Sequence, residues 1–327
     1  MPVTEPLRQD RGRHPSWVYA IPLRAEFRAI TVREGVLIRG DSGWGEFSPF
    51  RDYGDADAVA WWLAACEAAD VGWPEPVRTS VPVNATVPAV PAADVAAVLT
   101  RFPGCTTAKV KVAADGQAPG DDEERLRAVQ DALGPDGRIR IDVNGAWDAD
   151  TAAMLVPRYD RAAGGLEYVE QPCPTVEELA VLRRRVDVPI AADESIRRAD
   201  DPLRVARLEA ADIAVLKVQP LGGVRACLEI AERIDLPVVV SSALETSVGI
   251  AAGVALAAAL PELPYACGLA TVGLLERDVV VEPLVAREGA LPVRRPVPDE
   301  NALDAVRADD ATSAWWAERV ARVGSRP

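Results

Sequence analysis

The segment Thr107-Ala-Lys-Val-Lys-Val112 consists of apolar or β-branched residues, apart from two lysines at alternate positions. Such a run predicts a buried β-strand, and side chains at alternate positions of a strand lie on one face. A buried lysine is costly unless it is paired or neutral. We therefore expect Lys109 and Lys111 to lie together on the inner face of a sheet because a functional site there needs their amines.

Lysine is otherwise nearly absent from the chain. Only three of its 36 basic residues are lysine, and the third, Lys217, lies in a similar apolar run over residues 213–219. Lysine can lose its proton at an accessible pH, whereas arginine cannot. The three positions therefore indicate sites that need a titratable amine. The alternative is that these lysines only pair with core carboxylates for structure.

Runs of this kind recur along the chain and alternate with helical stretches. Strands are predicted at residues 81–86, 107–112, 138–144, 166–171, 189–195, 213–219, 238–244 and 266–271. Helices are predicted between them at residues 92–101, 121–133, 148–159, 176–185, 202–209, 224–233 and 247–259. This alternation predicts parallel βαβ units, and eight strands favour an α/β fold of the (β/α)8 type, a modified TIM barrel, over an open doubly wound sheet. No glycine-rich phosphate loop follows a strand, which argues against a nucleotide-binding fold.

The two ends of the chain do not follow this alternation of strands and helices. Residues 1–80 predict a separate α+β domain, with strands at 17–27, 29–39 and 43–47 and a helix at 55–69. The barrel is expected over residues 81–283. Residues 284–327 are rich in proline and charge and end in an amphipathic helix near 310–323. We expect this last segment to pack back on the N-terminal domain and complete it.

Composition excludes several classes of function. Acidic residues outnumber basic ones by 50 to 36, and the net charge of −14 argues against nucleic acid or an anionic membrane as partner. The single histidine, His14, lies before the barrel, which excludes a histidine triad, a histidine-rich zinc site and a histidine base. Nothing in the sequence indicates an obligatory protein partner.

The sequence also predicts the cellular location of the protein. Its five cysteines are odd in number and form no CxxC motif, as expected of reduced thiols in the cytosol. Residues 1–15 contain no apolar signal core. The most apolar stretch, 248–260, is shorter than the ~20 residues that span a bilayer. We therefore expect a soluble cytoplasmic protein.

Acidic side chains lie at the carboxyl ends of three successive predicted strands, where barrel enzymes carry their chemistry. These are Asp142, Glu170 and Asp193. Three carboxylates that converge repel one another unless a cation is present. Because the site offers only oxygen ligands, it favours Mg²⁺, with Mn²⁺ as a substitute. The alternative for each acid is a helix cap or an ion pair with an arginine.

The lysine-bearing strands flank the acid-bearing strands, so amines can approach a metal-bound substrate from opposite sides. This arrangement suits removal of a proton next to a carboxylate, with the enediolate stabilised by the metal. Lys109 and the metal charge would lower the pKa of the neighbouring Lys111 toward the range useful for a base.

Lys-x-Lys on one strand, Asp, Glu and Asp on the next three, and Lys on a later strand together resemble the enolase superfamily, in its muconate-lactonizing subgroup. Residues 43–50, GWGEFSPF, resemble the capping domain of that superfamily. Within the subgroup the chain resembles the o-succinylbenzoate synthase family, on residues 141–147, 170–172, 241–246 and 268–271. The branch with a histidine base is excluded because the barrel lacks histidine. Dipeptide epimerases carry an Asp-x-Asp motif near the last strand, which residues 268–273 lack.

The resemblance implies a Mg²⁺-dependent lyase of menaquinone biosynthesis. Its small carboxylate substrate would be 2-succinyl-6-hydroxy-2,4-cyclohexadiene-1-carboxylate, which loses water by syn β-elimination and becomes 2-succinylbenzoate. Lys111 would be the base, Lys217 would stabilise the enediolate from the other side, and Lys109 would tune Lys111. The substrate contacts implied are Asn144, Ser241, Ser242, Gly268 and Leu269.

Two other enzymes remain open at this point. An N-acylamino acid racemase or related epimerase could use the same two lysines for a 1,1-proton transfer. A metal-free Schiff-base lyase or aldolase would also use a strand-borne lysine. A third alternative is a barrel that only binds a ligand.

Overall fold

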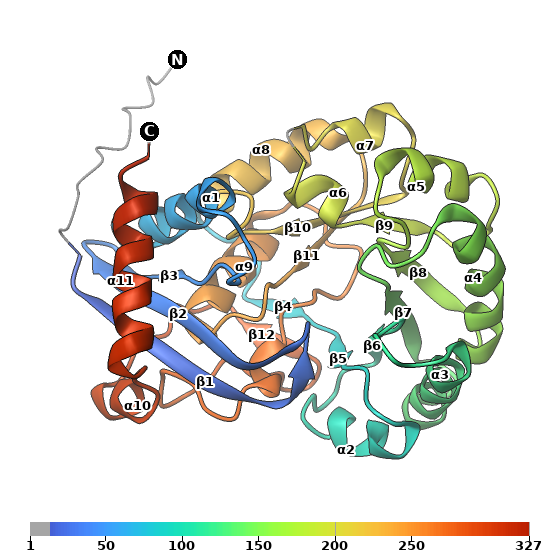
Figure 1. Ribbon diagram of the computed structural model, residues 1–327, viewed down its shortest axis with the longest axis horizontal. Coiled ribbons are helices and arrows are strands. Elements are labelled where there is room, and N and C mark those ends of the chain that lie inside the picture. The colour runs from blue at the N-terminus through green and yellow to red at the C-terminus, as the bar shows by residue number, and fades with distance from the viewer. Residues whose placement is uncertain (1–13, 200, 327) are drawn as a thin grey trace.

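The computed structural model describes residues 14–199 and 201–326. Residues 1–13, most of the stretch in which we expect no signal core, lie outside the described residues. The chain forms a barrel and an antiparallel sheet that packs against one side of it, as Figure 1 shows. In the described part of the chain no helix is long and apolar enough to cross a membrane.

Seven parallel strands form the wall of the barrel, in the order β11-β10-β9-β8-β7-β6-β5. Their bounds are β5 (Ala85–Val87), β6 (Thr107–Lys111), β7 (Arg138–Asp142), β8 (Leu166–Glu170), β9 (Ile190–Ala192), β10 (Ile213–Lys217) and β11 (Val238–Ser241). Because neighbouring strands are parallel, their carboxyl ends meet at one rim, which is where the predicted acids and lysines lie. The predicted fold class is confirmed.

The predicted eighth strand, residues 266–271, is not a regular strand. The segment instead makes one parallel bridge on each side, from Cys267 to Val83 and from Gly268 to Ser241. The Cys267 amide donates to the Pro82 carbonyl at 2.7 Å and the Gly268 amide to the Val240 carbonyl at 2.9 Å. This short segment therefore closes the ring with two residues, since the chain turns into a 3-10 helix (Thr271–Leu274) directly afterwards.

Several predicted strands end two or three residues too late, and two others keep only three residues in the barrel. Residues 81–86 divide into β4 (Ser80–Pro82), which pairs with β12 (Ala290–Pro292) outside the barrel, and β5, which joins the barrel. Residues 189–195 contain only the short β9, because the chain leaves the sheet at Asp193 and starts the helix α6 (Glu194–Arg197).

Helices cover the outside of the barrel (Figure 1). They are α2 (Val95–Leu99), α3 (Pro119–Leu133), α4 (Ala149–Ala163), α5 (Val176–Arg183), α7 (Arg204–Arg207), α8 (Val224–Ile234) and α9 (Ser247–Ala259). The helix predicted at 202–209 shrinks to the single turn of α7. Nearly every residue of α9 is buried, which explains why its sequence is apolar on all sides: it lies between the barrel strand β11 and β3 of the antiparallel sheet.

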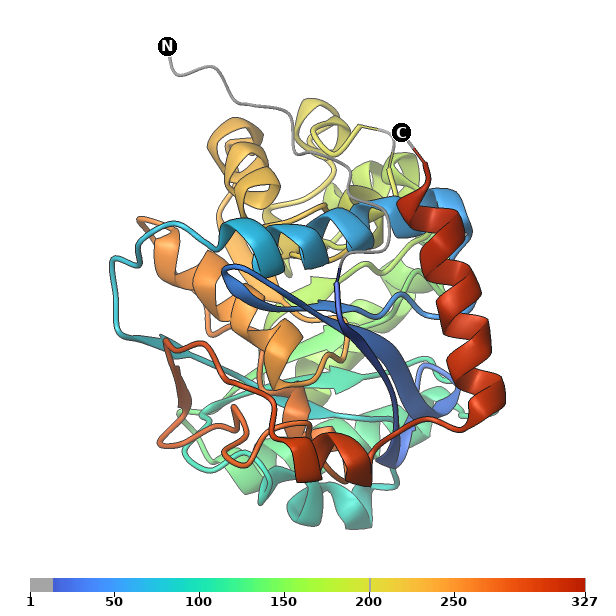
Figure 2. The same cartoon turned by 90° about the vertical axis from the view of Figure 1, so that its left-hand side faces the viewer.

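The antiparallel sheet belongs to a second unit, the cap. Its strands β1 (Ser16–Phe27), β2 (Ile30–Gly40) and β3 (Gly43–Phe47) are followed by α1 (Asp55–Cys66) and a π-helical turn (Glu67–Val71). The C-terminal helices α10 (Glu300–Ala305) and α11 (Asp310–Gly324) return to this unit, and Figure 2 shows α11 lying along it. The Ala20 amide donates to the Val306 carbonyl at 2.9 Å. The last segment thus packs on the N-terminal sheet.

One continuous cluster of buried apolar side chains runs from the cap into the wall of the barrel. It includes Phe47 from β3, Trp61 from α1 and Leu256 from α9. The five cysteines are free thiols, as the sequence predicts. Because the two units share this core, the cap is held in a defined position over one side of the barrel.

Candidate active site

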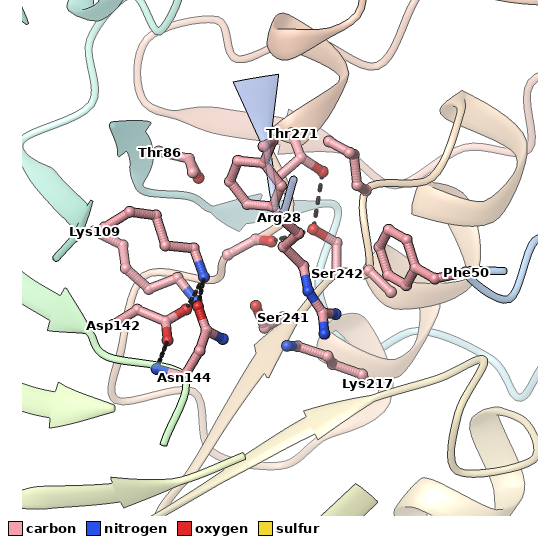
Figure 3. Close-up of a pocket in the computed structure, with 15 residues that line it drawn as sticks. Arg28, Phe50, Thr86, Lys109, Asp142, Asn144, Lys217, Ser241, Ser242 and Thr271 are labelled. Atoms are coloured by element: carbon pink, nitrogen blue, oxygen red, sulfur yellow. Dashed lines mark hydrogen bonds and ion pairs between the residues drawn. The ribbon is translucent and has the colours of Figure 1, made fainter. Parts of the chain in front are cut away.

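A cavity opens at the carboxyl ends of the barrel strands, under the cap (Figure 3). Strands β5, β6, β7, β10 and β11 contribute to its wall, as do two segments of the cap. The lining residues are Phe27, Arg28, Phe50, Thr86, Lys109, Lys111, Asp142, Asn144, Lys217, Ser241, Ser242, Ala243, Leu244, Gly268 and Thr271. The three lysines of the chain all line this one cavity.

The lysines meet the predicted acids at the floor of the cavity. The Lys109 Nζ lies 2.8 Å and 2.9 Å from the two carboxylate oxygens of Glu170, and 3.2 Å from Asp142 Oδ2. The Lys111 Nζ donates to Asp142 Oδ2 at 2.5 Å. The strand register explains these contacts, because Lys111 is paired with Asp142, and Asp142 with Glu170, across adjacent parallel strands.

On the other side of the acids, β10 supplies the third lysine. The Lys217 Nζ donates to Asp193 Oδ2 at 2.6 Å, and Arg197 donates its Nε to Asp193 Oδ1 at 2.8 Å. The structure therefore brings together the three lysines and the three carboxylates that the sequence predicts, with Lys111 and Lys217 on strands separated by β7, β8 and β9.

The carboxylates are fully shielded from solvent, with exposed fractions of 1% for Asp142, 1% for Glu170 and 0% for Asp193. Burial alone would raise their pKa values. For Asp142, Lys111 and Lys109 outweigh burial and hold the pKa well below its ordinary value. Arg197 and Lys217 do the same for the pKa of Asp193.

Glu170 behaves differently from the other two acids. Burial, followed by repulsion from Asp142, raises its pKa to about 7 against the opposing effect of Lys109. Asp193 adds to this repulsion. Placing a proton or a cation here would relieve the repulsion among the three carboxylates.

The surroundings of the two lysines of β6 shift their pKa values in opposite directions. Burial lowers the pKa of Lys111, and the positive charge of Lys109 lowers it further, against Asp142. Although burial acts in the same direction on Lys109, Glu170 and Asp142 together raise its pKa. Lys111 is therefore the amine of this pair that more readily gives up its proton.

The donor set fits a hard divalent cation by its chemistry. Asp142, Glu170 and Asp193 offer only oxygen atoms, they lie at the carboxyl ends of three adjacent strands, and burial together with repulsion from the other two acids raises the pKa of Glu170. Within residues 14–199 and 201–326, no three carboxyl, imidazole or thiol groups are already arranged to hold a metal ion. Each of the three carboxylates contacts a lysine instead.

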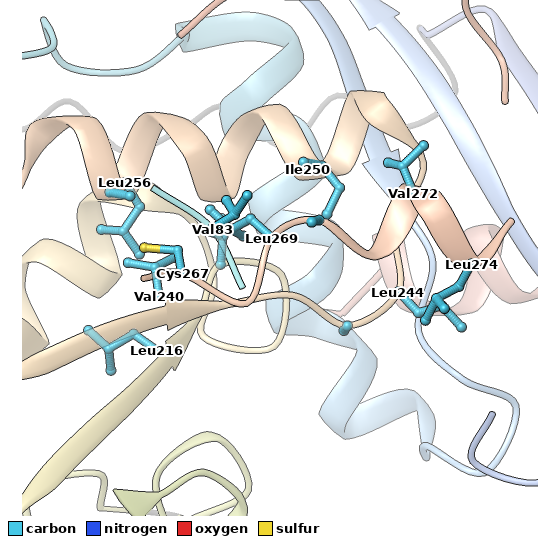
Figure 4. Close-up of a cluster of buried hydrophobic side chains, with 14 of the residues drawn as sticks. Val83, Leu216, Val240, Leu244, Ile250, Leu256, Cys267, Leu269, Val272 and Leu274 are labelled. Carbon is cyan, nitrogen blue, oxygen red and sulfur yellow. The ribbon is translucent and has the colours of Figure 1, made fainter. Parts of the chain in front are cut away.

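The predicted substrate contacts divide into two groups. Asn144, Ser241, Ser242 and Gly268 line the cavity. Asn144 Oδ1 accepts from Lys111 at 2.7 Å, and the Ser242 hydroxyl donates to the Gly268 carbonyl at 2.7 Å. Leu269 does not line the cavity, because its side chain is buried in the apolar cluster between α9 and the barrel wall (Figure 4).

Several lining residues were not predicted from the sequence. Phe27, Arg28 and Phe50 come from the cap, and the Phe27 ring centroid lies 5.2 Å from the Lys111 Nζ. Thr86 comes from β5, and its buried hydroxyl has no hydrogen-bond partner among the described residues. No pattern in the neighbouring sequence marks the cap residues as part of the cavity wall, because they reach the barrel only when the two units dock. The alternation of Thr86 with the apolar residues of β5 could have indicated that residue.

Arg33 of β2 joins the cap to the cavity wall. Its side chain is 2% exposed and donates to the carbonyl of Leu244 at 2.8 Å and to that of Ala243 at 3.2 Å, in the loop after β11. Leu244 has φ 65°, a left-handed conformation that bulky residues rarely adopt. Arg33 thus holds a strained turn that forms part of the cavity wall.

Residues 43–50, singled out in the sequence, provide a second connection between the units. Glu46 accepts hydrogen bonds from the Tyr19 hydroxyl at 2.8 Å and from the Gly249 amide, in the first turn of α9, at 3.0 Å. A carboxylate is favourable at a helix N-terminus because the amides there are unpaired. The Ser48 amide donates at 3.1 Å to Gln219, two residues beyond Lys217.

Comparisons with known proteins agree with this architecture. Residues 92–300 match the family described as enolase C-terminal domain-like, and residues 18–69 match the enolase N-terminal domain-like family. Among solved structures, a muconate lactonizing enzyme from Pseudomonas fluorescens, complexed with muconolactone, has a TM-score of 0.76 at 23% identity over 90% of this chain and 98% of that chain. The muconate lactonizing enzyme from Pseudomonas putida has a TM-score of 0.73 at 22% identity.

Curated relatives are much closer in sequence. The o-succinylbenzoate synthase of Thermobifida fusca (strain YX) is 64% identical over 303 residues, which covers 93% of this chain and 94% of the relative. The o-succinylbenzoate synthase of Mycobacterium tuberculosis (strain ATCC 25618 / H37Rv) is 54% identical over 98% of this chain and 96% of the relative. These findings confirm the resemblance seen in the sequence: the chain belongs to the enolase superfamily and, within it, to the family of the o-succinylbenzoate synthases.

Proposed function

We propose that the protein catalyses the o-succinylbenzoate synthase reaction, the loss of water from 2-succinyl-6-hydroxy-2,4-cyclohexadiene-1-carboxylate to give 2-succinylbenzoate. The choice of substrate is supported by relatives that are 54% to 64% identical over nearly the whole chain. The chemistry is supported by one observation above all, which is that Lys111 and Lys217 line the same cavity from strands on either side of three buried carboxylates. The enzyme is thus a carbon–oxygen lyase of the menaquinone pathway.

Lys111 is the base of this proposal. Its Nζ takes the proton from the ring carbon that bears the carboxylate, and the electron pair of that C–H bond is delocalised onto the carboxylate, as an enediolate, until it returns to the ring and expels the hydroxyl. The hydroxyl on the neighbouring carbon then leaves with a proton returned by the same Lys111 ammonium, so that water is released and the ring becomes aromatic. The lowered pKa of Lys111 supports the first step, because a base must be available without its proton.

Asp142, Glu170 and Asp193 would hold a divalent cation, Mg²⁺ or Mn²⁺, which supplies positive charge beside the substrate carboxylate as negative charge develops there. The pKa of Glu170, raised by burial and by Asp142, supports a need for positive charge among these groups. To admit a cation, Lys109 and Lys111 would have to yield part of their contact with Asp142.

Lys217 acts from the other side of the substrate. Its ion pair with Asp193 directs the amine at the floor of the cavity, where it would stabilise negative charge or contact the ring by a cation–π interaction. Asn144, Ser241, Ser242 and the Gly268 backbone are proposed to contact the substrate, and the Leu269 backbone remains a prediction.

The proposal extends to the partners and the location of the protein. The substrate is a small carboxylate, and no nucleic acid, membrane or obligatory protein partner is needed. The net charge of −14 supports the first of these exclusions, since a polyanion would be repelled. We propose that the reaction takes place in the cytoplasm.

A direct ultraviolet assay tests the proposal, because the cyclohexadiene substrate and the aromatic product absorb differently. We expect rapid turnover with Mg²⁺, loss of turnover after treatment with EDTA, and recovery when Mg²⁺ is restored. The absence of dehydration in the Mg²⁺-loaded protein would contradict the proposed function.

N-acylamino acid racemase activity is the second candidate, and the placement of Lys111 and Lys217 around one cavity favours it as well. In that reaction one amine would remove a proton from one face and the other would return a proton to the opposite face. Incorporation of deuterium from D₂O into an N-succinyl amino acid, measured beside the dehydration rate, separates the two activities.

A further inference from the structure

The tip of the β1–β2 hairpin reaches from the cap into the cavity, with a two-residue turn made of Arg28 and Ala29. Phe27 and Ile30 are the last paired residues of the two strands, and Arg28 and Ala29 have φ of 52° and 59°. Turns with two left-handed residues favour Asn-Gly or other small residues, since a side chain is unfavourable in this conformation. A long arginine side chain in such a turn raises the free energy of the folded protein. Backbone strain of this kind is concentrated at functional sites.

Arg28 presents a cation to the cavity that no protein group neutralises. Its guanidinium lies 4.6 Å from the centroid of the Phe50 ring and points into the cavity in Figure 3. Among the described residues it has no hydrogen-bond or ion-pair partner. Arg33 also lies against Phe50, at 4.5 Å, but its guanidinium donates to four backbone carbonyls and to the Ser48 hydroxyl.

The charges of the site point to what Arg28 binds. Lys109, Lys111 and Lys217 pair with Asp142, Glu170 and Asp193, and Arg197, which also contacts Asp193, pairs with Glu194, so four positive side chains meet four negative ones. Arg28 is an additional positive charge in the same cavity. A ligand with a second carboxylate, remote from the one at the reacting carbon, would provide the missing counter-charge.

We propose that Arg28 binds the carboxylate at the end of the succinyl chain and thereby makes the enzyme selective for dicarboxylates. This inference rests on the proposed function, whose substrate carries one carboxylate on the ring and one on the chain. A guanidinium suits this role because it binds a carboxylate through two parallel hydrogen bonds. Phe50 keeps the side chain extended over the cavity, which lowers the entropy lost on binding. Arg28 acts as a specificity-determining residue and takes no part in proton transfer.

Binding of two ligands to the Mg²⁺-loaded protein tests the inference by calorimetry. The first ligand is 2-succinylbenzoate, and the second is 2-butanoylbenzoate, in which a methyl group replaces the chain carboxylate. In the Arg28→Met variant we expect the dissociation constant of 2-succinylbenzoate to rise about 10- to 100-fold, the range for loss of hydrogen bonds to a charged group. The dissociation constant of 2-butanoylbenzoate should change less than about threefold, and Arg28→Lys should recover part of the loss.

Arg39→Met is the matched control. Arg39 is an exposed arginine of the same cap sheet, it lies 5.9 Å from the centroid of the Trp44 ring, and it does not line the cavity. Its substitution should leave both dissociation constants unchanged.

The result that overturns the inference is an Arg28→Met variant that binds both ligands as the wild type does, or that loses the same factor for both. An equal loss would mean that Arg28 only supports the cap. Wild-type turnover reports separately on the proposed function. If the wild type dehydrates the substrate while Arg28→Met shows no selective loss, only the role of Arg28 is wrong. If the wild type neither dehydrates the substrate nor binds 2-succinylbenzoate, the proposed function is wrong and the inference falls with it.

Discussion

Replacement of Arg33 by methionine should both destabilise the protein and loosen its active site. The guanidinium makes five hydrogen bonds inside the protein, to Leu244, Glu34 and Ala243 and to two atoms of Ser48. Methionine preserves part of the packing against Phe50 but removes the Arg33 donor from the carbonyls of Ser48, Ala243 and Leu244, whereas the Ser48 hydroxyl still accepts from Gln219. Removing one partner from a buried charged network costs about 3–5 kcal/mol, so we expect a loss of about 4 kcal/mol in the free energy of unfolding.

Equilibrium unfolding in urea measures this loss. At an m-value of about 3 kcal/mol/M, the midpoint should fall by roughly 1 M. Because Arg33 also holds the Ala243–Leu244 turn of the cavity wall, the KM for the substrate should rise about tenfold, with a smaller effect on kcat, as for loss of uniform binding. Arg51→Met is the control, since Arg51 is half-exposed and pairs with Glu34 at the surface, where an ion pair contributes about 0–1 kcal/mol.

The reasoning would be refuted by an Arg33→Met protein that unfolds within about 1 kcal/mol of the wild type and retains its KM. Such a result would mean that the strained conformation of Leu244 is maintained by the rest of the loop, independently of the cap.

Three further predictions concern the site and its surroundings. Lys111→Ala and Lys217→Ala should each lower kcat by about 10³-fold or more in the ultraviolet assay while circular dichroism stays native, and wild-type turnover in Lys111→Ala would rule out this residue as the base. Asp193→Asn should weaken Mg²⁺ binding at least about tenfold by calorimetry; unchanged affinity would exclude Asp193 as a ligand. Burial, followed by Glu46, raises the pKa of Glu245 from 4.5 to about 7, so the folded protein holds a proton that the unfolded chain releases. Glu245 should therefore lower the free energy of unfolding by about 3 kcal/mol as the pH rises from 4.5 through 7, in addition to the effect of Glu170, and Glu245→Gln should remove this part of the slope. An unchanged slope in that variant would contradict the assignment.

The lysines and acids at the floor of the active-site cavity could be predicted from the sequence. Their positions depend on the local pattern and on the fact that the carboxyl ends of adjacent parallel strands meet. Lys109 and Lys111 stand out against an apolar run, and Asp142 and Glu170 each end another such run. Once the strands are parallel and adjacent, their carboxyl ends meet, so these side chains come together without further information.

Other features depend on contacts that the local pattern does not encode. Residues 266–271 resemble the other strands in composition, but their ladder is limited to Cys267 and Gly268, and the Arg140 side chain adds a hydrogen bond across the barrel to the Ala266 carbonyl at 2.7 Å. Arg28 could not be predicted for a related reason. It is one of many arginines, and only the docking of the cap on the barrel gives it a cavity to face.

The rarity of lysine has a practical consequence for anyone who studies this protein in solution. Since every side-chain ammonium nitrogen of the chain belongs to Lys109, Lys111 or Lys217, incorporation of ¹⁵N-labelled lysine would produce only three side-chain resonances. Each resonance would come from the active-site cavity, so ligand binding and proton exchange there could be followed with no background from lysines on the molecular surface.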